Sequence, residues 1–474
     1  GSVSERDEKI TDKKIKTSIW KEYIQAAEDN NEPGKFTAFI GFEWTSMPGG
    51  NNLHRVVIFK DDADKAGQVL PFSAFDSEDP EDLWQWLEAY EDKTGGSVLA
   101  IPHNGNVSNG LMFSESTFDG KPLTPDYAKA RARWEPLYEV TQIKGDGEAH
   151  PALSPDDEFA DFETWDRGNL LGNALKEPAM LKHEYARSAL KLGLTLDKKL
   201  GANPFKFGMV GSTDSHTGLS TADSDNYFGK VGHLEPSSER MHIDFMEGKE
   251  FNWSGEETFS AGYVGVWAQE NTRASLFDAM QRRETYATTG PRSTVRFFGG
   301  WDFQDEDVNR PNSSAIGYEK GVPMGGELAK AKKGRAPQFM ITALKDPEGA
   351  NLDRVQVVKG WVDAKGNEQE KVYNVAASTG RIITDNKLTS VGSTVNVEDA
   401  TYSNSIGSVS IGTVWTDPDF NADESAFYYV RVLEIPTPRW TAYDAKRFKS
   451  KLPAGEPLEI QARAYTSPIW YTPK

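Results

Sequence analysis

The chain has 474 residues, a length for which two domains are the natural expectation. It carries 53 Lys and Arg against 72 Asp and Glu, and the formal charge of −19 repels phosphate backbones and argues against a nucleic-acid partner. It has no cysteine, which excludes disulfides, thiolate zinc sites and cysteine nucleophiles, so any metal must be held by His and carboxylate side chains. Its apolar stretches fall short of the ~18 residues that a membrane span needs.

The compartment is only weakly indicated by the sequence. Absence of cysteine suits a periplasmic or secreted protein but is equally compatible with the cytosol. The opening "GSVSERDEKITDKK" is not a signal peptide, and a targeting segment could have been removed ahead of it. We therefore expect a periplasmic or secreted protein, with a cytoplasmic location as the alternative.

Helical and strand-like segments alternate through the first part of the chain. Apolar residues at helical spacing, together with start and stop signals, predict helices over 15–29, 80–96, 124–133, 184–196 and 272–283. Short apolar runs predict strands over 36–46, 53–59, 97–104, 137–143 and 205–210. This alternation is typical of a parallel α/β domain with four or five βα units.

The pattern changes after about residue 292. Strand-like runs separated by Gly, Asp, Asn and Pro then follow one another over 337–346, 354–361, 371–378, 408–415, 426–435 and 458–465. We therefore expect an α/β domain over residues 1–292 and a mostly β, sandwich-like domain over residues 293–474.

Metal-compatible side chains lie at the ends of several predicted strands. Glu43, His103 and the pair Asp214 and His216 in "GSTDSHTG" each follow an apolar run. The loops after parallel strands face one common cleft, so these groups are expected to meet there. Taken singly, Glu43 could be an ordinary paired carboxylate and His103 a structural histidine. Three strand ends that each present a ligand favour a metal site instead.

Two further histidines have settings that allow a role in the same site. His54 comes 11 residues after Glu43 and begins the next strand, so it is either a half-buried strand residue or a further ligand. His150 follows Lys144 in a polar loop that suits a rim for an anionic substrate, with a plain solvated loop as the alternative.

The chemistry of such a cluster is hydrolytic. Divalent ions lower the pKa of bound water and polarise the bond under attack, and a His, Asp and Glu set without thiolates suits Mn, Zn or Fe. Other catalytic classes have weaker support, because the chain has neither a G-x-S-x-G elbow nor a G-x-G-x-x-G turn between a strand and a helix.

Several long motifs resemble one known group of enzymes. They are "GFEWTSMPGGNNLHRVVIF", "IPHNGNVSNGLMF", "VTQIKGDGEAHP", "GSTDSHTGL", "RRETYATTGPR" and "RAYTSPIWYTP". In this order they resemble the polymerase and histidinol phosphatase (PHP) superfamily of metal-dependent phosphoesterases, and more closely the bacterial family known as domain of unknown function 3604. The resemblance implies a distorted TIM-like barrel with two or three metal ions at its C-terminal face. It places the family's ligands on Glu43, His54, His103, Asp214 and His216.

One departure from the PHP pattern changes what we expect of the barrel and of its metal site. The superfamily begins with H-x-H on its first strand and usually a D-H pair on its second, and neither precedes Glu43. We therefore expect an α/β, PHP-type barrel that lacks its first strands, with a metal site incomplete in this chain alone. The missing strands would have been cleaved, truncated or supplied by a separate N-terminal segment. The open sheet edge also invites association, including formation of a homo-oligomer.

The resulting expectation is a metal-dependent hydrolase acting on a phosphoester or related polar ester with a small anionic substrate. Its expected catalytic residues are Glu43, His103, Asp214 and His216, and its expected substrate-binding residues are Arg55, Asn104, Asn106, Lys144, His150 and Arg292. Arg55 and Arg292 could equally be structural ion-pair partners. The alternatives are a non-catalytic binding or scaffold protein for a carbohydrate, peptide or envelope partner on a degenerate barrel, and metal-assisted cleavage of a different bond.

Overall fold

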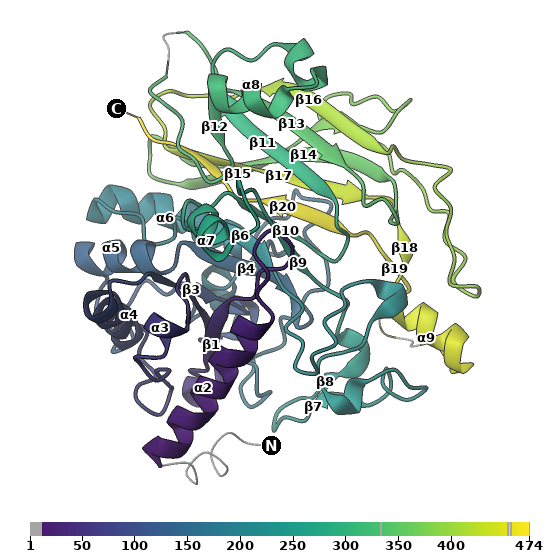
Figure 1. Ribbon diagram of the computed structural model, residues 1–474. Helices are drawn as coiled ribbons and strands as arrows, with labels where there is room; N and C mark the ends of the chain where they lie inside the picture. Colours follow the sequence, from purple (N-terminus) through teal and green to yellow (C-terminus); the bar gives the residue numbers. More distant parts are fainter. Residues whose placement is uncertain (1–11, 332–333, 453–454, 456, 474) are drawn as a thin grey trace.

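The computed structural model describes residues 12–331, 334–452, 455 and 457–473 (Figure 1). Most of the opening segment considered above for targeting lies outside these residues. Among the described helices, none combines the length and the apolar character that a membrane crossing requires.

The first sheet consists of three antiparallel strands. β1 (Ile40–Trp44) pairs with β2 (Arg55–Phe59), and β2 pairs with β3 (Val98–Pro102). The connection between β1 and β2 contains only the short 3-10 helix η2 (Pro48–Gly50), too little chain for a crossover helix, so β2 must run back along β1. As a result β1 and β3 point in the same direction, with the reversed β2 between them.

A second sheet continues this direction. β4 (Leu137–Gln142) pairs in parallel with β6 (Gly208–Gly211), and the short β5 (Gly145–Asp146) folds back on β4. A parallel bridge between His103 and Glu139 joins β3 to β4. The carboxyl ends of β1, β3, β4 and β6 and the amino end of β2 therefore lie at one edge of the strands.

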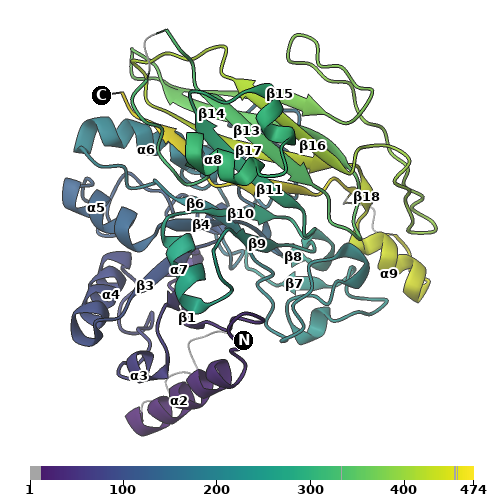
Figure 2. The same ribbon diagram turned by 45° about the horizontal axis from the view of Figure 1, so that its top comes forward.

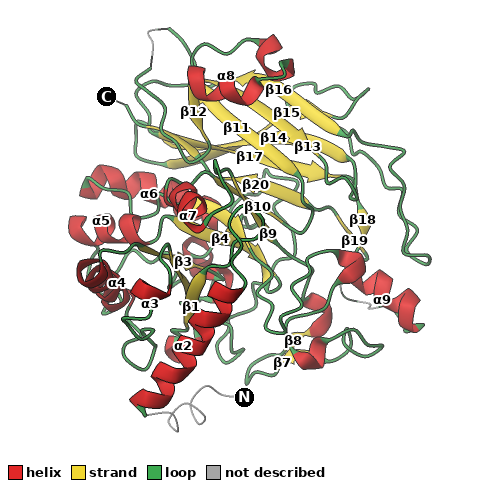
Figure 3. Ribbon diagram, viewed as in Figure 1, coloured by secondary structure: helices red, strands yellow, loops and turns green. Residues whose placement is uncertain are grey.

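Helices surround these strands, as Figure 3 shows. They are α2 (Lys13–Asp29), α3 (Ala63–Ala66), α4 (Pro80–Thr94), α5 (Pro125–Trp134), α6 (Ala186–Leu200) and α7 (Arg273–Gln281). The start and stop signals of α4 act as expected, because the Asp79 side chain accepts from the Glu81 N–H and Gly95 ends the helix at φ 61°. Leu83 and Leu87 on its inner face are fully buried.

The C-terminal part is rich in β-structure. Its larger sheet has the order β15, β14, β17, β20, β10, β9, with β21 also paired to β17, and its smaller sheet has the order β12, β11, β13, β16. Apolar residues of both sheets, such as Phe297, Ile341, Val357 and Val430, belong to one buried cluster. The two sheets therefore enclose a shared core, as in a sandwich (Figure 2).

The bounds of these strands are β9 (Tyr263–Val266), β10 (Thr285–Thr288), β11 (Thr294–Gly300), β12 (Gly321–Pro323), β13 (Gln338–Leu344), β14 (Leu352–Val362), β15 (Glu368–Ala377), β16 (Ser410–Thr416), β17 (Ala426–Glu434), β20 (Arg463–Thr466) and β21 (Ile469–Tyr471). The smaller elements are β7 (Asp244–Met246), β8 (Trp253–Ser254), β18 (Thr437–Pro438), β19 (Glu459–Ile460), α8 (Ser313–Lys320) and α9 (Trp440–Phe448). The remaining 3-10 helices are η3 (Gly105–Val107), η4 (Pro178–His183), η5 (Ser224–Asn226), η6 (Gly232–Leu234), η7 (Gly255–Glu257) and η8 (Asp305–Asn309).

The expected TIM-like barrel is not formed by the described strands. They make several open sheets, and the neighbours β1, β2 and β3 are antiparallel, whereas a TIM barrel consists of parallel strands. The physical reason is the short β1–β2 connection, which forces a reversed strand into the sheet. A mixed α/β fold with a β-rich C-terminal part is what the structure shows.

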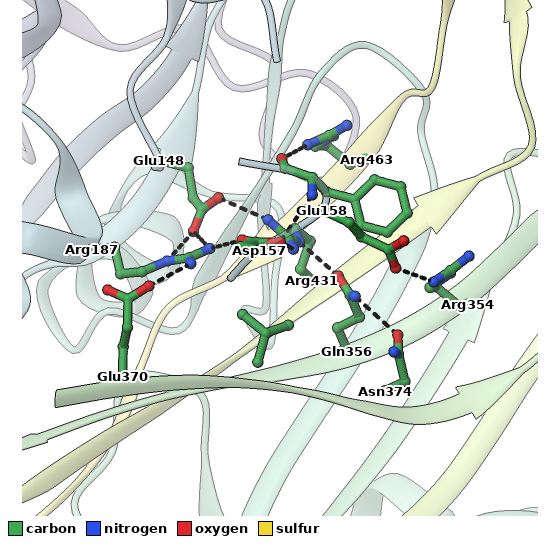
Figure 4. A network of polar contacts seen from close by, with 12 residues as sticks. Glu148, Asp157, Glu158, Arg187, Arg354, Gln356, Glu370, Asn374, Arg431 and Arg463 are labelled. Carbon is green, nitrogen blue, oxygen red and sulfur yellow. Dashed lines mark hydrogen bonds and ion pairs between the residues drawn. The ribbon is translucent and has the colours of Figure 1, made fainter. Parts of the chain in front are cut away.

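The two parts of the chain are joined by strand pairing and by buried charges. β10 and β9 precede residue 292 but belong to the sheet of β17 and β20. In Figure 4, Arg187 of α6 and Arg431 of β17 share the carboxylates of Glu148 and Asp157. The domain boundary between residues 292 and 293 stays a prediction, and the larger sheet extends across it.

Candidate metal centre

Glu43, His54 and His103 meet because of the strand directions. Glu43 is near the carboxyl end of β1, His103 follows β3, and His54 precedes the reversed β2. The backbone N–H of His103 donates to the carbonyl of His54 at 3.4 Å, which places the two histidines side by side. We name Glu43, His54 and His103 the histidine cluster.

The ligand atoms of the histidine cluster are close enough to share one ion. Glu43 Oε1 lies 3.1 Å from His54 Nδ1 and 2.9 Å from His103 Nε2. One ligand atom from each residue lies within 4.8 Å of the other two, and no other such trio occurs in the described part of the chain. The second nitrogen of each ring, His54 Nε2 and His103 Nδ1, is buried without a hydrogen-bond partner.

The protonation states of the cluster follow from burial and from these contacts. Burial opposes ionisation of Glu43, but hydrogen bonds from His103 and His54 hold its pKa well below the usual range. Burial lowers the pKa of His54 to about 4, so this ring is neutral at pH 7. For His103 burial lowers the pKa, but the hydrogen bond to Glu43 and the negative charges of Glu139, Glu43 and Asp214 together outweigh burial and raise it. An ionised carboxylate and a neutral imidazole are forms that bind metal.

Asp214 is held by cations beside the histidine cluster. Lys144 and Lys230 both form ion pairs with its Oδ2, and Gln142 Nε2 donates to the same oxygen at 2.8 Å. Burial acts against ionisation, but the charges of the two lysines hold the pKa of Asp214 well below its usual range. His216 Nε2 lies 3.2 Å from Asp214 Oδ1, with half of its side chain exposed. Asp214 and His216 therefore adjoin the trio without belonging to it.

Three residues of this region were missed by the sequence reasoning. Glu139 and Gln142 are buried polar residues in the otherwise apolar strand "LYEVTQI", a signal that could have marked them. Glu139 Oε2 accepts from the Ser212 hydroxyl, its Oε1 has no partner, and burial raises its pKa. Lys230 lies in a loop without any pattern that points to Asp214. Burial and the charge of Lys144 lower its pKa to about 7.

The predicted substrate-orienting asparagines lie at the same edge. Asn104 Oδ1 accepts from Gln142 Nε2 at 2.5 Å, and Asn106 Nδ2 donates to the Lys144 carbonyl at 3.0 Å. Asn104 and Asp214 both have left-handed backbone conformations, with φ values of 51° and 49°. Such conformations in residues other than glycine gather at functional sites, where the surrounding fold enforces them.

Three other predicted substrate-binding residues have different surroundings. Arg55 is buried and pairs with Glu135 at 3.0 Å, an ion pair of the kind given above as the alternative to substrate binding. His150 is buried against Asp166 rather than exposed on a rim. Arg292 is exposed near the C-terminal part, with its guanidinium 5.6 Å from the ring of Tyr263.

The structure defines a mixed α/β protein with a compact group of histidine and carboxylate ligands at its strand ends. The family model described as "Protein of unknown function (DUF3604)" matches residues 2–473, so the chain belongs to the DUF3604 family. No curated protein and no solved structure matches the chain.

Proposed function

We propose that this chain is a metal-dependent hydrolase of the PHP type that acts on a phosphoester or related polar ester. The observation that carries the proposal is the histidine cluster, in which one carboxylate oxygen lies within hydrogen-bond distance of two imidazole nitrogens. About a third of the Glu43 side chain is exposed, so the cluster is reached from the surface at this residue. When bound there, Mn, Zn or Fe would activate water as the nucleophile.

The residues of the cluster fit a transition-metal ion better than calcium or magnesium. Two of the three donors are imidazole nitrogens, whereas calcium and magnesium prefer oxygen ligands. The buried ring nitrogens without partners show that the protein atoms do not satisfy these two histidines. In this proposal Glu43, His54 and His103 hold the ion, and Asp214 and His216 supply further ligands when Asp214 exchanges its lysine partners for metal.

The two lysines suit an anionic substrate. Lys144 and Lys230 bring two cationic groups to one carboxylate beside the cluster. A phosphoryl or carboxyl oxygen that replaced Asp214 at either ammonium group would keep its charge paired. Lys230, with its pKa near 7, can give a proton to a leaving group at neutral pH.

The outer edge of β1 has room for an additional strand. Among the described strands β1 pairs only with β2. A groove of about 930 Å³ runs beside it and is lined by Ile19, Tyr23 and Phe75, all at least half exposed, as well as by Glu43. An N-terminal segment carrying further ligands would cover these apolar side chains and pair with β1. We include such a segment in the proposal.

Metal content tests the proposal directly. The chain is loaded with Mn or Zn, dialysed and analysed for metal, alone and after addition of a separately expressed segment that carries H-x-H strands. We expect weak binding alone and about two or three ions after mixing. Glu43→Gln and His103→Asn should each lower metal affinity by more than about tenfold. The matched control His242→Asn changes an exposed histidine and should not.

Activity measurements separate the remaining alternatives. Release of nitrophenol from bis(nitrophenyl) phosphate by the metal-loaded protein would support the hydrolase, and elimination products would assign a different bond cleavage. Absence of metal from both samples would contradict the proposal and favour a non-catalytic binding protein.

A further inference from the structure

A second enclosed site lies on the side of the molecule where the C-terminal sheets meet the loop after β6. A cavity of about 200 Å³ is bounded by the end of β17, the start of α9 and the loops that contain Asp225, Asp346 and Tyr402. We name it the β17 cavity. It shares no lining residue with the histidine cluster.

Glu434 at the end of β17 is the most unusual residue of the β17 cavity. It is 3 % exposed, and its Oε1 accepts a hydrogen bond from the Ser293 hydroxyl at 2.9 Å. Its Oε2 accepts no hydrogen bond from a described residue, and no described Lys, Arg or His lies within ion-pair distance. The ammonium group of Lys345, whose charge acts on Glu434, donates to three backbone carbonyls instead. Ionisation of a buried carboxyl group that has no counter-ion costs free energy.

The rest of the cavity lining has the character of a cation site. Asp225 and Asp346 add two further carboxylates, and Tyr402 and Tyr443 add aromatic rings. Glu434, Asp225, Asp346 and Tyr402 all line this cavity, and the charges of the three carboxylates raise the pKa of Tyr402. Arg292 is the one cationic side chain of the lining, and it is exposed.

The spacing of the carboxylates argues against a metal ion. The described residues contain only one trio of His and carboxylate ligands within 4.8 Å, and that trio is the histidine cluster. No three described carboxylates of the β17 cavity therefore lie close enough to coordinate one ion together. A longer cation can reach several of them, and its alkyl chain can lie against the tyrosine rings.

We propose that the β17 cavity binds a small aliphatic amine in its protonated form, with an ammonium group on Glu434 and the chain directed toward Asp225 and Asp346. The ammonium group would supply the counter-ion that Glu434 lacks. A diamine is the best match, because its second ammonium group would meet the carboxylates at the opening of the cavity.

The ionisation of Glu434 gives this binding a distinct signature. Burial raises the pKa of Glu434 to about 8, against the opposing hydrogen bond from Ser293, with a further upward contribution from Asp346 and a downward one from Lys345. Asp223, Asp225, Glu348, Arg292, Tyr402 and Tyr443 are the other ionisable groups of the lining. At pH 7 the Glu434 carboxyl is mostly protonated, so ammonium binding should release a proton and tighten as the pH rises toward 8.

Calorimetric titration of the full chain with putrescine tests the proposal, with neutral 1,4-butanediol as the matched ligand. We expect putrescine to bind and butanediol not to bind. Titration at pH 7 in two amine-free buffers of different ionisation enthalpy should show proton release. Glu434→Gln should weaken putrescine binding at least tenfold and abolish the proton release, and Asp225→Asn should weaken it several-fold. Glu398→Gln, which removes an exposed carboxylate elsewhere, should leave it unchanged.

Three results would overturn the proposal. They are equal binding of butanediol, unchanged binding by Glu434→Gln, and binding of Ca²⁺ at the cavity with no binding of putrescine. Asp225→Asn alters an exposed side chain and is expected to keep the fold, so it tests the site even where Glu434→Gln is poorly folded. Neither variant changes the histidine cluster, so failure here is independent of the proposed hydrolase activity.

Discussion

Buried carboxyl groups of this chain differ in ionisation because their neighbours differ. Asp214 lies between two lysine ammonium groups, whose charges outweigh the cost of burial and keep it ionised. Glu434 has only a serine hydroxyl as a hydrogen-bond donor, so burial raises its pKa to about 8. The same side-chain chemistry therefore gives an anion at one site and a neutral acid at the other near pH 7.

The free energy of unfolding should reveal the neutral form of Glu434. Its pKa is higher in the folded protein than in the unfolded chain, so its stabilising contribution is complete below about pH 4.5 and is lost as the pH rises through 8. Glu434→Gln mimics the protonated form at every pH. We expect it to differ from the original protein by less than about 1 kcal/mol at pH 5 and to be more stable by on the order of 4 to 5 kcal/mol at pH 8.5.

Urea unfolding at the two pH values, without added amine, measures this difference. Because the other titrating groups are common to both proteins, the difference between the two proteins gives the contribution of Glu434 to the pH dependence of the free energy of unfolding. Parallel pH profiles for the two proteins would contradict the prediction.

At the scale of elements, helix α6 contributes a buried charged contact between the two parts of the chain. Arg187 on α6 is 1 % exposed and pairs with Glu148 at 2.6 Å, Asp157 at 2.8 Å and Glu370 at 3.1 Å. Glu370 belongs to β15 of the larger sheet, so the helix reaches across to the C-terminal part (Figure 4). Burial of this many charges is tolerated because each has a partner.

Removal of one member of this network should strongly lower the free energy of unfolding. Arg187→Met leaves the buried carboxylates of Glu148 and Asp157 with Arg431 as their one remaining arginine partner, and we expect a loss of about 3 to 5 kcal/mol in the free energy of unfolding. Arg133→Met is the matched control, because Arg133 pairs with Glu91 on an exposed surface and should contribute less than about 1 kcal/mol. Denaturant unfolding measures both variants, and similar losses in the two would contradict the role assigned to Arg187.

At the scale of the whole molecule, the larger sheet ties the early and late parts of the chain together. β10 pairs with β9 on one side and with β20 on the other. Tyr286 of β10 also belongs to the buried cluster shared by the two C-terminal sheets. The later part therefore completes hydrogen bonds and apolar packing that begin before residue 292.

A fragment of residues 1–292 should not fold as an independent unit. The fragment would leave the β20-facing edge of β10 unpaired and Tyr286 without the apolar partners that cover it. We expect it to lack a cooperative thermal transition in circular dichroism, whereas the full chain shows one. A cooperative transition in the isolated fragment would show that the domain boundary at 292 is also a folding boundary.

The sequence by itself determined most helices and strands, because periodicity and capping residues act locally; α4 with Asp79 and Gly95 is one example. Strand-end reasoning also brought Glu43 and His103 into one candidate site. Only the tertiary structure decided the strand directions: the reversal of β2 places His54 beside His103 and excludes an all-parallel TIM barrel of the described strands. The positions of Lys230 beside Asp214, and of Glu434 in one cavity with Asp225 and Tyr402, likewise depend on the fold, because contacts between distant segments leave no periodic signal in either segment.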